Sequence, residues 1–314
     1  MVTAITLNYN QSKYTIDCAQ SVLDSDYGDF QLIIIDNGST EENYQSLLSG
    51  LDLSNDRLRV VRLKDNVGYV GGVNIGLKKV FEEDNSDFCL VLNNDTLIDP
   101  GAISSLVETA TKFENKAIVS GKVYHYDEPT YLQYIGNRKQ PGILNYKSLV
   151  SGGRELDSGQ FDQEMELDML DDIFWLIPKS IFEVVGYYSD YFFLYGEQND
   201  YAIRAIKSGF TLVYTPSAKI WHKGSITTAD GDRDSPKLLY WKILSTCKLS
   251  VIHWTEKESK SFVENWKRKL LFRYLLKAIL RQKSWNHYKA VVKAFSVFNH
   301  WNEVRYKDNG YNPF

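Results

Sequence analysis

Cysteine, histidine and long apolar runs are scarce in this sequence of 314 residues. The three cysteines, Cys18, Cys89 and Cys247, are odd in number, widely spaced and without a Cys-x-x-Cys pair, which predicts reduced thiols in a cytosolic protein. No uncharged apolar stretch approaches the length that crosses a bilayer, so any membrane contact must be peripheral. No basic leader with an apolar core precedes the first predicted strand, and we therefore expect no signal peptide and a cytoplasmic location.

Charge is nearly balanced overall but is unevenly placed along the chain. The formal net charge of −4 gives no reason to expect nucleic acid as a partner. Between Lys257 and Lys293, however, eleven Lys or Arg stand against two acidic residues. Apolar residues recur there at helical spacing: Phe262, Trp266, Leu270 and Tyr274. Such a helix either lies on an anionic membrane surface, such as the inner face of the cell membrane, or packs on the catalytic domain or in a homodimer. The sequence leaves these alternatives open.

Short apolar runs alternate with helical patterns over the first 115 residues. This alternation predicts βαβ units and a parallel sheet. The expected strands lie at 5–7, 32–35, 58–63 and 88–92, and the expected helices at 14–23, 41–48, 71–81 and 100–113. A looser stretch from 117 to 159 predicts extended segments and loops. Beyond it we expect strands at 167–177 and 210–214, short helices at 178–185 and 200–208, and a helical C-terminal region from 235 to about 299.

Polar residues follow each of the four predicted parallel strands. The carboxyl ends of parallel strands meet at one edge of a sheet, where open α/β sheets bind ligands. These residues include Asn8, Asn10, Asp36, Asn37, Asn66, Gly68, Asn93, Asn94 and Asp95. The sequence therefore predicts a ligand site along this edge.

Asp95 is the most informative of these residues, because it ends the apolar strand Phe88–Leu92. A carboxylate at the end of a buried strand suggests a ligand, and a divalent cation is the first to consider. The alternative is a structural one, in which Asp95 caps the turn before Pro100.

Several segments together resemble the family-2 glycosyltransferases of the GT-A fold. They are the strand end Asp36-Asn37-Gly38-Ser39-Thr40, the glycine-rich segment from Asn66 to Gly76, the element Asn93-x-Asp95, the run from Phe192 to Arg204, and Trp221-His222-Lys223-Gly224. The likeness extends from Val2 to Gly224 and is closest to the rhamnosyltransferase-like branch that builds bacterial surface polysaccharides. The segments agree in order and spacing, although each alone is a weak signal.

This resemblance implies an α/β fold: a GT-A type, Rossmann-like, mostly parallel sheet with flanking helices, plus a helical C-terminal region. It implies a catalytic domain at 1–225, with a nucleotide-sugar-binding half at 1–115 and an acceptor-binding half at 116–225, followed by the helical region at 226–314. The implied activity is inverting, metal-dependent transfer of a sugar. The donor would be a UDP- or dTDP-sugar, and the acceptor a glycan or lipid-linked glycan.

The resemblance also implies roles for particular residues. Asp95 and His222 would bind Mg²⁺ or Mn²⁺, which suits hard oxygen ligands and a borderline imidazole. Asp36 would hydrogen-bond the base or the ribose, although it could also cap a helix. The remaining residues expected to contact the nucleotide-sugar are Asn8, Asn10, Asn37, Asn66, Gly68, Gly71, Asn74 and Asn94. The glycines alone are a weak signal, since they could simply allow a helix to pack closely on the sheet.

One position departs from the family pattern. Relatives carry Glu-Asp-x-Asp, in which the middle acid deprotonates the acceptor hydroxyl, whereas this chain has Gln198 there. An amide cannot accept that proton, and general-base catalysis contributes typically about 10²–10⁴-fold. Either Glu197 serves as the base, or Asp200 does, or the protein is impaired or uses another kind of acceptor. Asp200 could instead cap its helix or pair with Arg204; we favour Glu197 slightly.

Two other functions stay open at this point. A catalytically impaired pseudo-transferase, which binds a nucleotide-sugar without turning it over, would explain Gln198. A nucleotidyltransferase would favour a Gly-rich, basic loop after the first strand, and Asn8-Tyr9-Asn10-Gln11 is not such a loop.

Overall fold

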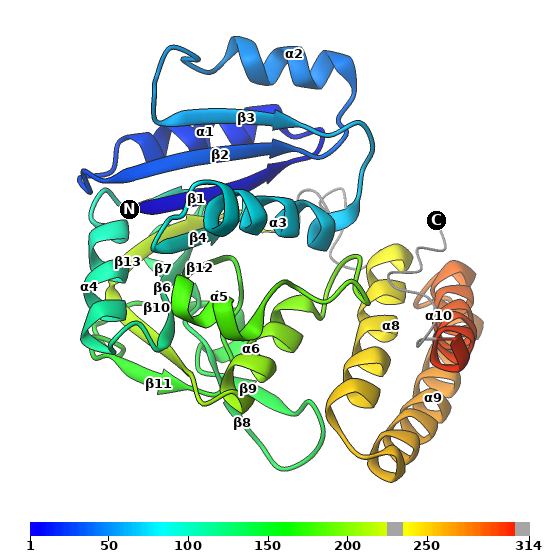
Figure 1. Ribbon diagram of the computed structural model, residues 1–314. Coiled ribbons are helices and arrows are strands. Elements are labelled where there is room, and N and C mark those ends of the chain that lie inside the picture. Colours follow the sequence, from blue (N-terminus) through cyan, green and yellow to red (C-terminus); the bar gives the residue numbers. More distant parts are fainter. Residues whose placement is uncertain (225–234, 305–314) are drawn as a thin grey trace.

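The structure is a computed structural model that describes residues 1–224 and 235–304. Positions 226–234 and 305–314 of the predicted C-terminal region lie outside the described residues. Figure 1 shows a central sheet with flanking helices and, beside it, the helices α8, α9 and α10. The predicted α/β class and the helical C-terminal region are confirmed.

The N-terminal part builds the parallel half of the sheet. Its strands are β1 (Val2–Asn8), β2 (Phe30–Asp36), β3 (Leu58–Arg62) and β4 (Phe88–Leu92), ordered β4-β1-β2-β3 and all parallel. Its helices are α1 (Ser12–Leu23), α2 (Glu41–Ser49), α3 (Gly68–Lys78), which continues into the π-helical turn η1 (Lys79–Glu83), and α4 (Ala102–Lys112). All the carboxyl ends of these strands therefore lie at one edge.

The second half extends the sheet with both orientations. The main order continues from β4 through β12 (Phe174–Pro178), β6 (Ala117–His125), β7 (Tyr131–Tyr134) and β10 (Glu155–Leu156). The strand β13 (Thr211–His222) runs parallel to β6 and also pairs with β5 (Thr96–Ile98) and β11 (Met165–Leu167). The remaining elements are the hairpin β8 (Asn137–Lys139) and β9 (Tyr146–Ser148), the short turn η2 (Ser151–Gly153), and the helices α5 (Lys179–Val185) and α6 (Glu197–Lys207).

Two apolar cores lie on opposite faces of the sheet. Along β2, Ile33 and Ile35 belong to one core and Leu32 and Ile34 to the other, as expected because successive side chains of a strand point to opposite faces. The helix α3 packs in the first core and α1 in the second. Cys18, Cys89 and Cys247 are buried free thiols, as predicted.

Several predicted elements have different boundaries, and three of the differences are described here. The strand predicted at 167–177 is two strands, β11 and β12, separated by the segment 168–173. The helix predicted from Asp200 begins three residues earlier, at Glu197. The strand predicted at 210–214 continues as β13 to His222, so this histidine lies at a strand end. Each correction bears on the site described below.

The C-terminal helices are α8 (Pro236–His253), α9 (Glu256–Ile279) and α10 (Trp285–Val304). They share an apolar core of their own, which includes the predicted helix-face residues Phe262, Trp266, Leu270 and Tyr274. That face therefore packs inside the bundle. Among the described residues, no helix is long and apolar enough to span a membrane.

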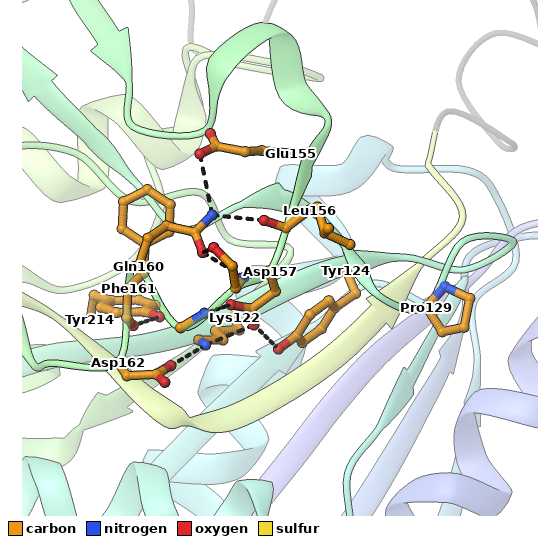
Figure 2. A network of polar contacts seen from close by, with 12 residues as sticks. Lys122, Tyr124, Pro129, Glu155, Leu156, Asp157, Gln160, Phe161, Asp162 and Tyr214 are labelled. Carbon is orange, nitrogen blue, oxygen red and sulfur yellow. Dashed lines mark hydrogen bonds and ion pairs between the residues drawn. The ribbon is translucent and has the colours of Figure 1, made fainter.

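A buried lysine fastens the segment 157–162 onto β6, as Figure 2 shows. Lys122 is 3% exposed and pairs with Asp157 at 2.8 Å and with Asp162. The Tyr124 hydroxyl donates to the same Asp157 oxygen at 2.6 Å. Burial alone would lower the pKa of Lys122, but the two carboxylates raise it above its ordinary value. We call these four residues the Lys122 network.

Candidate active site

A cavity of about 580 Å³ lies where β1, β2 and β4 end. Polar residues that follow these strands form one part of its lining, and residues of α6 and α8, including Lys237 and Trp241, form another. The site residues predicted from the sequence that line this cavity are Asn37, Asn66, Gly68, Asn94, Asp95, Glu197, Gln198 and His222. The structure thus brings together residues that are up to 185 positions apart, from Asn37 to His222.

Asp95 and His222 face each other in this cavity. The His222 Nε2 atom lies 3.3 Å from Asp95 Oδ1, and each residue is 8% exposed. The backbone N–H of Gly224 donates to Asp95 Oδ2 at 2.9 Å. Burial alone would raise the pKa of Asp95, but the contacts with His222 and Gly224 outweigh it and lower the pKa below its ordinary value. Asp95 is therefore ionised at neutral pH.

The tautomer of His222 is set by Gln133. The side-chain amide nitrogen of Gln133 lies 3.4 Å from the backbone carbonyl oxygen of His222. This contact orients the amide so that Gln133 Oε1 lies 2.6 Å from His222 Nδ1. Nδ1 therefore carries a proton. Nε2 can then face Asp95 Oδ1 in two ways: as the N–H of a protonated ring, the state in which His222 lowers the pKa of Asp95, or as the lone pair of the neutral ring. Two acceptor atoms this close repel each other unless a proton or a cation lies between them.

The pair fits a divalent cation. Neighbouring ligands at about 2.1 Å from an octahedral metal lie about 3 Å apart, close to the separation of the two acceptor atoms. Within residues 1–224 and 235–304, no group of three or more His, Cys, Asp or Glu side chains is arranged to hold a metal ion. Asp95 and His222 would therefore supply two ligands, and phosphate oxygens or water the rest.

The strand end after β2 and the loop before α3 form one hydrogen-bonded unit. The Asn37 amide donates to the Gly68 carbonyl at 3.0 Å and accepts from the Val67 N–H at 3.0 Å. Asn66 Oδ1 accepts from the Gly68 N–H at 2.8 Å. Gly68 has φ +79°, and a Cβ there would lie 2.6 Å from the Phe193 ring, so only glycine fits. This unit forms a rigid wall of the cavity.

Other predicted contacts lie outside the cavity lining. Asn8 and Asp36 are register partners in β1 and β2, both are fully buried, and the Asn8 amide donates to Asp36 Oδ1 at 2.7 Å. They hold the ends of these strands together. The other predicted site residues that do not line the cavity are Asn10, Gly71, Asn74 and Asp200.

Three carboxyl groups line the cavity, and the charges of the first two act on the third: Asp171, Asp172 and Glu197. We call them the carboxylate trio. The hydroxyls of Tyr69 and Tyr188 donate to Asp172 Oδ2 at 3.0 and 3.2 Å. Burial, followed by the charge of Asp171, raises the pKa of Asp172 to about 7. Burial and the charge of Asp172 raise the pKa of Glu197 well above its usual range. Asp172 therefore changes protonation near neutral pH, and the pKa of Glu197 is raised well above its usual range, as is common for acid–base groups.

The two candidate bases have different surroundings. Glu197 is 4% exposed, and its Oε2 is buried without a hydrogen-bond partner in the described part of the chain, as is Gln198 Oε1. Asp200 is engaged at both oxygens, with Arg204 Nε at 2.8 Å and with His253 Nε2 at 2.8 Å. Asp200 thus links α6 to the end of α8, which matches the ion-pair alternative weighed for it.

The sequence reading missed Asp171 and Asp172. The predicted strand at 167–177 includes both residues, whereas in the structure they lie in the segment that leads into β12. Because β12 runs antiparallel to β4, its start lies at the carboxyl edge of the parallel strands. The signal in the sequence was an acidic pair interrupting an apolar run, Leu170-Asp171-Asp172-Ile173. Tyr69, Lys237 and Trp241 were also missed as lining residues.

A mostly parallel sheet with a carboxylate, an imidazole and amides at its carboxyl edge is typical of α/β enzymes that bind nucleotides. The family model described as Glycosyl transferase family 2 matches residues 3–186, which is more than half of the chain. The chain belongs to that family, as its motifs predicted.

Individual relatives agree with this assignment. The chain is 24% identical over 220 residues to the N-acetylglucosaminyl-diphospho-decaprenol L-rhamnosyltransferase of Mycobacterium tuberculosis, covering 63% of this chain and 67% of that protein. It is 22% identical over 128 residues to the glycosyltransferase GlyG of Streptococcus pneumoniae, covering 41% of this chain and 40% of GlyG.

A solved structure shares the fold. The structure of GalNAc-T7 with UDP, GalNAc and Mn²⁺ superposes with a TM-score of 0.66 at 14% identity, covering 86% of this chain and 50% of that one. At this identity the likeness shows the GT-A type fold alone. The chain spans about half of that protein's length and less than half of GlyG's.

Proposed function

We propose that the protein is an inverting, metal-dependent glycosyltransferase that moves a sugar from a UDP- or dTDP-sugar to a glycan or lipid-linked glycan during surface polysaccharide synthesis. The observation that carries the proposal is the Asp95–His222 pair in the cavity, with its imidazole oriented by Gln133. The names of the rhamnosyltransferase and of the Mn²⁺-containing structure support the donor and metal classes. The cytoplasmic location and the homodimer stay predictions.

Different residues of the cavity have different roles in the proposed reaction. Asn37, Asn66 and Gly68 present a rigid polar wall to the nucleotide. Asp95 and His222 Nε2 would hold the divalent cation. When bound, that cation neutralises the charge developing on the departing diphosphate and favours the ionised forms of nearby carboxyls.

Transfer itself exchanges one bond for another at the anomeric carbon. The acceptor oxygen forms a bond to that carbon from the face opposite the diphosphate, the bond to the diphosphate oxygen breaks with its electron pair, and the configuration inverts. The acceptor hydroxyl proton passes to a carboxylate in the cavity. We assign this role to Glu197, because it lines the cavity and keeps a buried oxygen without a partner among the described residues.

Binding of the donor can be tested without turnover. Thermal shift of the purified protein with a panel of UDP-, dTDP- and GDP-sugars, with Mn²⁺ and with EDTA, should show stabilisation that needs both donor and metal. Asp95→Asn should abolish the metal-dependent part, whereas Asp127→Asn, a substitution outside the cavity lining, should retain it. Absence of metal-dependent stabilisation by any donor would contradict the proposal.

A second candidate function is a pseudo-transferase that binds the donor without turnover. It is favoured by Gln198, whose buried Oε1 has no partner in the described residues. Gln198→Asp distinguishes the two. A large gain in turnover would show that the natural chain is impaired, and an unchanged rate in an active enzyme would show that the base lies elsewhere.

A further inference from the structure

Exposed apolar side chains are concentrated in one stretch of the helical bundle, from the last turns of α9 to the first turns of α10. Six of the twelve large apolar side chains that are exposed in the described part of the chain lie between positions 272 and 292. They are Phe272 at 70%, Ile279 at 60%, Leu280 at 56%, Trp285 at 53%, and Leu276 and Val292 at 43% each. We call Phe272, Leu276, Ile279, Leu280 and Trp285 the apolar tip. It comprises the end of α9 and the start of α10.

The apolar tip is a separate face from the one that holds the bundle together. Phe272, Leu276 and Ile279 recur at i, i+4 and i+7, so they form one stripe along α9. Leu270, by contrast, is 7% exposed and belongs to the apolar core of the bundle. The stripe therefore contributes little to packing of the bundle, and an exposed apolar patch of this kind marks an interaction site.

The segment that carries the apolar tip is strongly basic. From Lys267 to Lys293 there are nine Lys or Arg and no Asp or Glu. Lys269 and Arg273 are exposed and lie three positions before and one position after Phe272. A partner for this face must offer apolar contact and a high density of negative charge together.

We propose that the apolar tip docks on the surface of an anionic lipid bilayer. Aromatic and aliphatic side chains enter the boundary between head groups and acyl chains, while the flanking Lys and Arg bind lipid phosphates. A symmetric pairing of two copies through the same face would bring their basic segments together, and like charges oppose that contact. A bilayer satisfies both requirements of the face.

The helical bundle that carries the docking surface also contributes to the lining of the cavity. Figure 1 shows α8 between the sheet and the other two helices. Trp241 of α8 lines the cavity and belongs to the same apolar core as Phe295 of α10. If the proposed function holds, docking keeps the cavity beside a lipid-linked acceptor in the membrane. The docking itself does not depend on that function.

Co-sedimentation with vesicles tests the proposal. The protein should bind vesicles of phosphatidylcholine with phosphatidylglycerol, and bind vesicles of phosphatidylcholine alone at least about tenfold more weakly. The double variant Phe272→Ser/Ile279→Ser should lose about tenfold or more in partitioning to the anionic vesicles. Its matched control is Leu53→Ser/Val184→Ser, whose side chains are 56% and 62% exposed away from the apolar tip. The control should bind as the natural chain does.

A second variant separates charge from apolar contact. Lys269→Gln/Arg273→Gln should reduce the preference for anionic vesicles and the sensitivity of binding to salt. Equal binding of both vesicle types, or equal loss in the tip variant and its control, would overturn the proposal. So would absence of vesicle binding together with a dimer that the tip variant dissociates, because a second copy would then cover the face.

The experiments distinguish failure of the membrane-docking proposal from failure of the proposed function. Thermal unfolding shows that each variant is folded, and metal-dependent stabilisation by a nucleotide-sugar reports on the proposed function without any vesicle. A tip variant that binds donor normally but no longer sediments supports docking. A natural chain that sediments but binds no donor overturns only the proposed function.

Discussion

At the scale of single residues, Glu197 is the group whose removal tests the proposed proton transfer. Glu197→Gln keeps the size of the side chain but cannot accept a proton, so kcat should fall by about 10²–10⁴-fold while nucleotide-sugar binding is retained. Asp200→Asn is the comparison. Because Asp200 contacts Arg204 and His253 between α6 and α8, its loss should lower stability more than turnover. The measurements are initial rates and urea unfolding of both variants.

The result could also relocate the base within the trio. Full activity of Glu197→Gln together with loss of activity in Asp172→Asn would assign the proton acceptor to Asp172, whose pKa of about 7 suits that role.

Asp172 should also make stability depend on pH. Its pKa is about 7 in the folded chain and about 3.9 in the unfolded one, so the folded state binds more protons between these values. Stability therefore falls as pH rises from about 4 to about 7, by no more than about 4 kcal/mol, and levels off above that. Asp172→Asn removes this dependence. In urea unfolding, the free energy of unfolding of the variant should therefore increase relative to that of the natural chain as pH rises. If the difference in the free energy of unfolding between the two proteins stays constant over this pH range, the raised pKa of Asp172 is contradicted.

The sequence predicted which polar residues gather at the sheet edge but not which of them face the cavity. Asn8 and Asp36 follow the same strand-end rule as Asn37 and Asn94, yet they hydrogen-bond each other because they are register partners on neighbouring strands. That choice depends on strand register, which a single sequence does not reveal. Asp95 and His222 were predicted together through the family motif, and the structure places them 3.3 Å apart.

At the scale of secondary-structure elements, the Lys122 network makes a prediction about β6 and the segment 157–162. Lys122→Met would leave the half-buried carboxylate of Asp157 without its cation, at a cost of about 1–3 kcal/mol in the free energy of unfolding. The double variant Lys122→Met/Asp157→Asn should recover part of this, because the half-buried charge is then gone and only the exposed carboxylate of Asp162 is left without its cation. Urea unfolding of the single and double variants measures the difference. Equal stabilities of the natural chain and Lys122→Met would show that the network contributes nothing.

The same network predicts a response to acid. Burial alone would raise the pKa of Asp157, but Lys122 and Tyr124 outweigh it and lower the pKa. The stabilisation is therefore complete above the unfolded value of about 3.9 and is lost as pH falls through the lower folded value.

The bounds of elements that begin with a usual capping residue were predicted closely. The bounds of elements without such a residue, or without a break in an apolar run, were not. The predicted helix at 41–48 is observed at Glu41–Ser49, where Thr40 accepts a hydrogen bond from the Asn43 N–H as N-cap. The helix α6 has no side-chain cap, since it follows Gly196 at φ +87°, and its start was placed three residues late. The break between β11 and β12 was missed because the apolar run continues beyond the two aspartates. Helix starts without capping residues and strand breaks within apolar runs need tertiary information.

At the scale of the whole molecule, the cavity joins the sheet to the helical bundle through aromatic contacts. The Trp241 ring stacks on Phe193 with centroids 5.3 Å apart and planes at 16°, and the Phe193 carbonyl accepts from the Tyr69 N–H at 3.0 Å. Phe193 also abuts Gly68, which belongs to the proposed donor wall. Position 241 is thus coupled to the nucleotide side of the cavity although it lies far along the chain. The sequence alone gave no reason to connect these regions.

This coupling predicts different effects for two buried tryptophans of the same bundle. Trp241→Ala and Trp301→Ala each remove a side chain that is 3% or less exposed, so each should cost about 3–5 kcal/mol of stability. Only Trp241 lines the cavity, so only its loss should weaken nucleotide-sugar binding, because Phe193 then loses the ring that holds it against Gly68. Calorimetric titration of both variants, at a temperature where each is folded, measures the donor Kd. Equal weakening in the two variants would mean that the bundle supports the site only through overall stability, whereas a change confined to Trp241→Ala would establish that α8 forms part of the binding site.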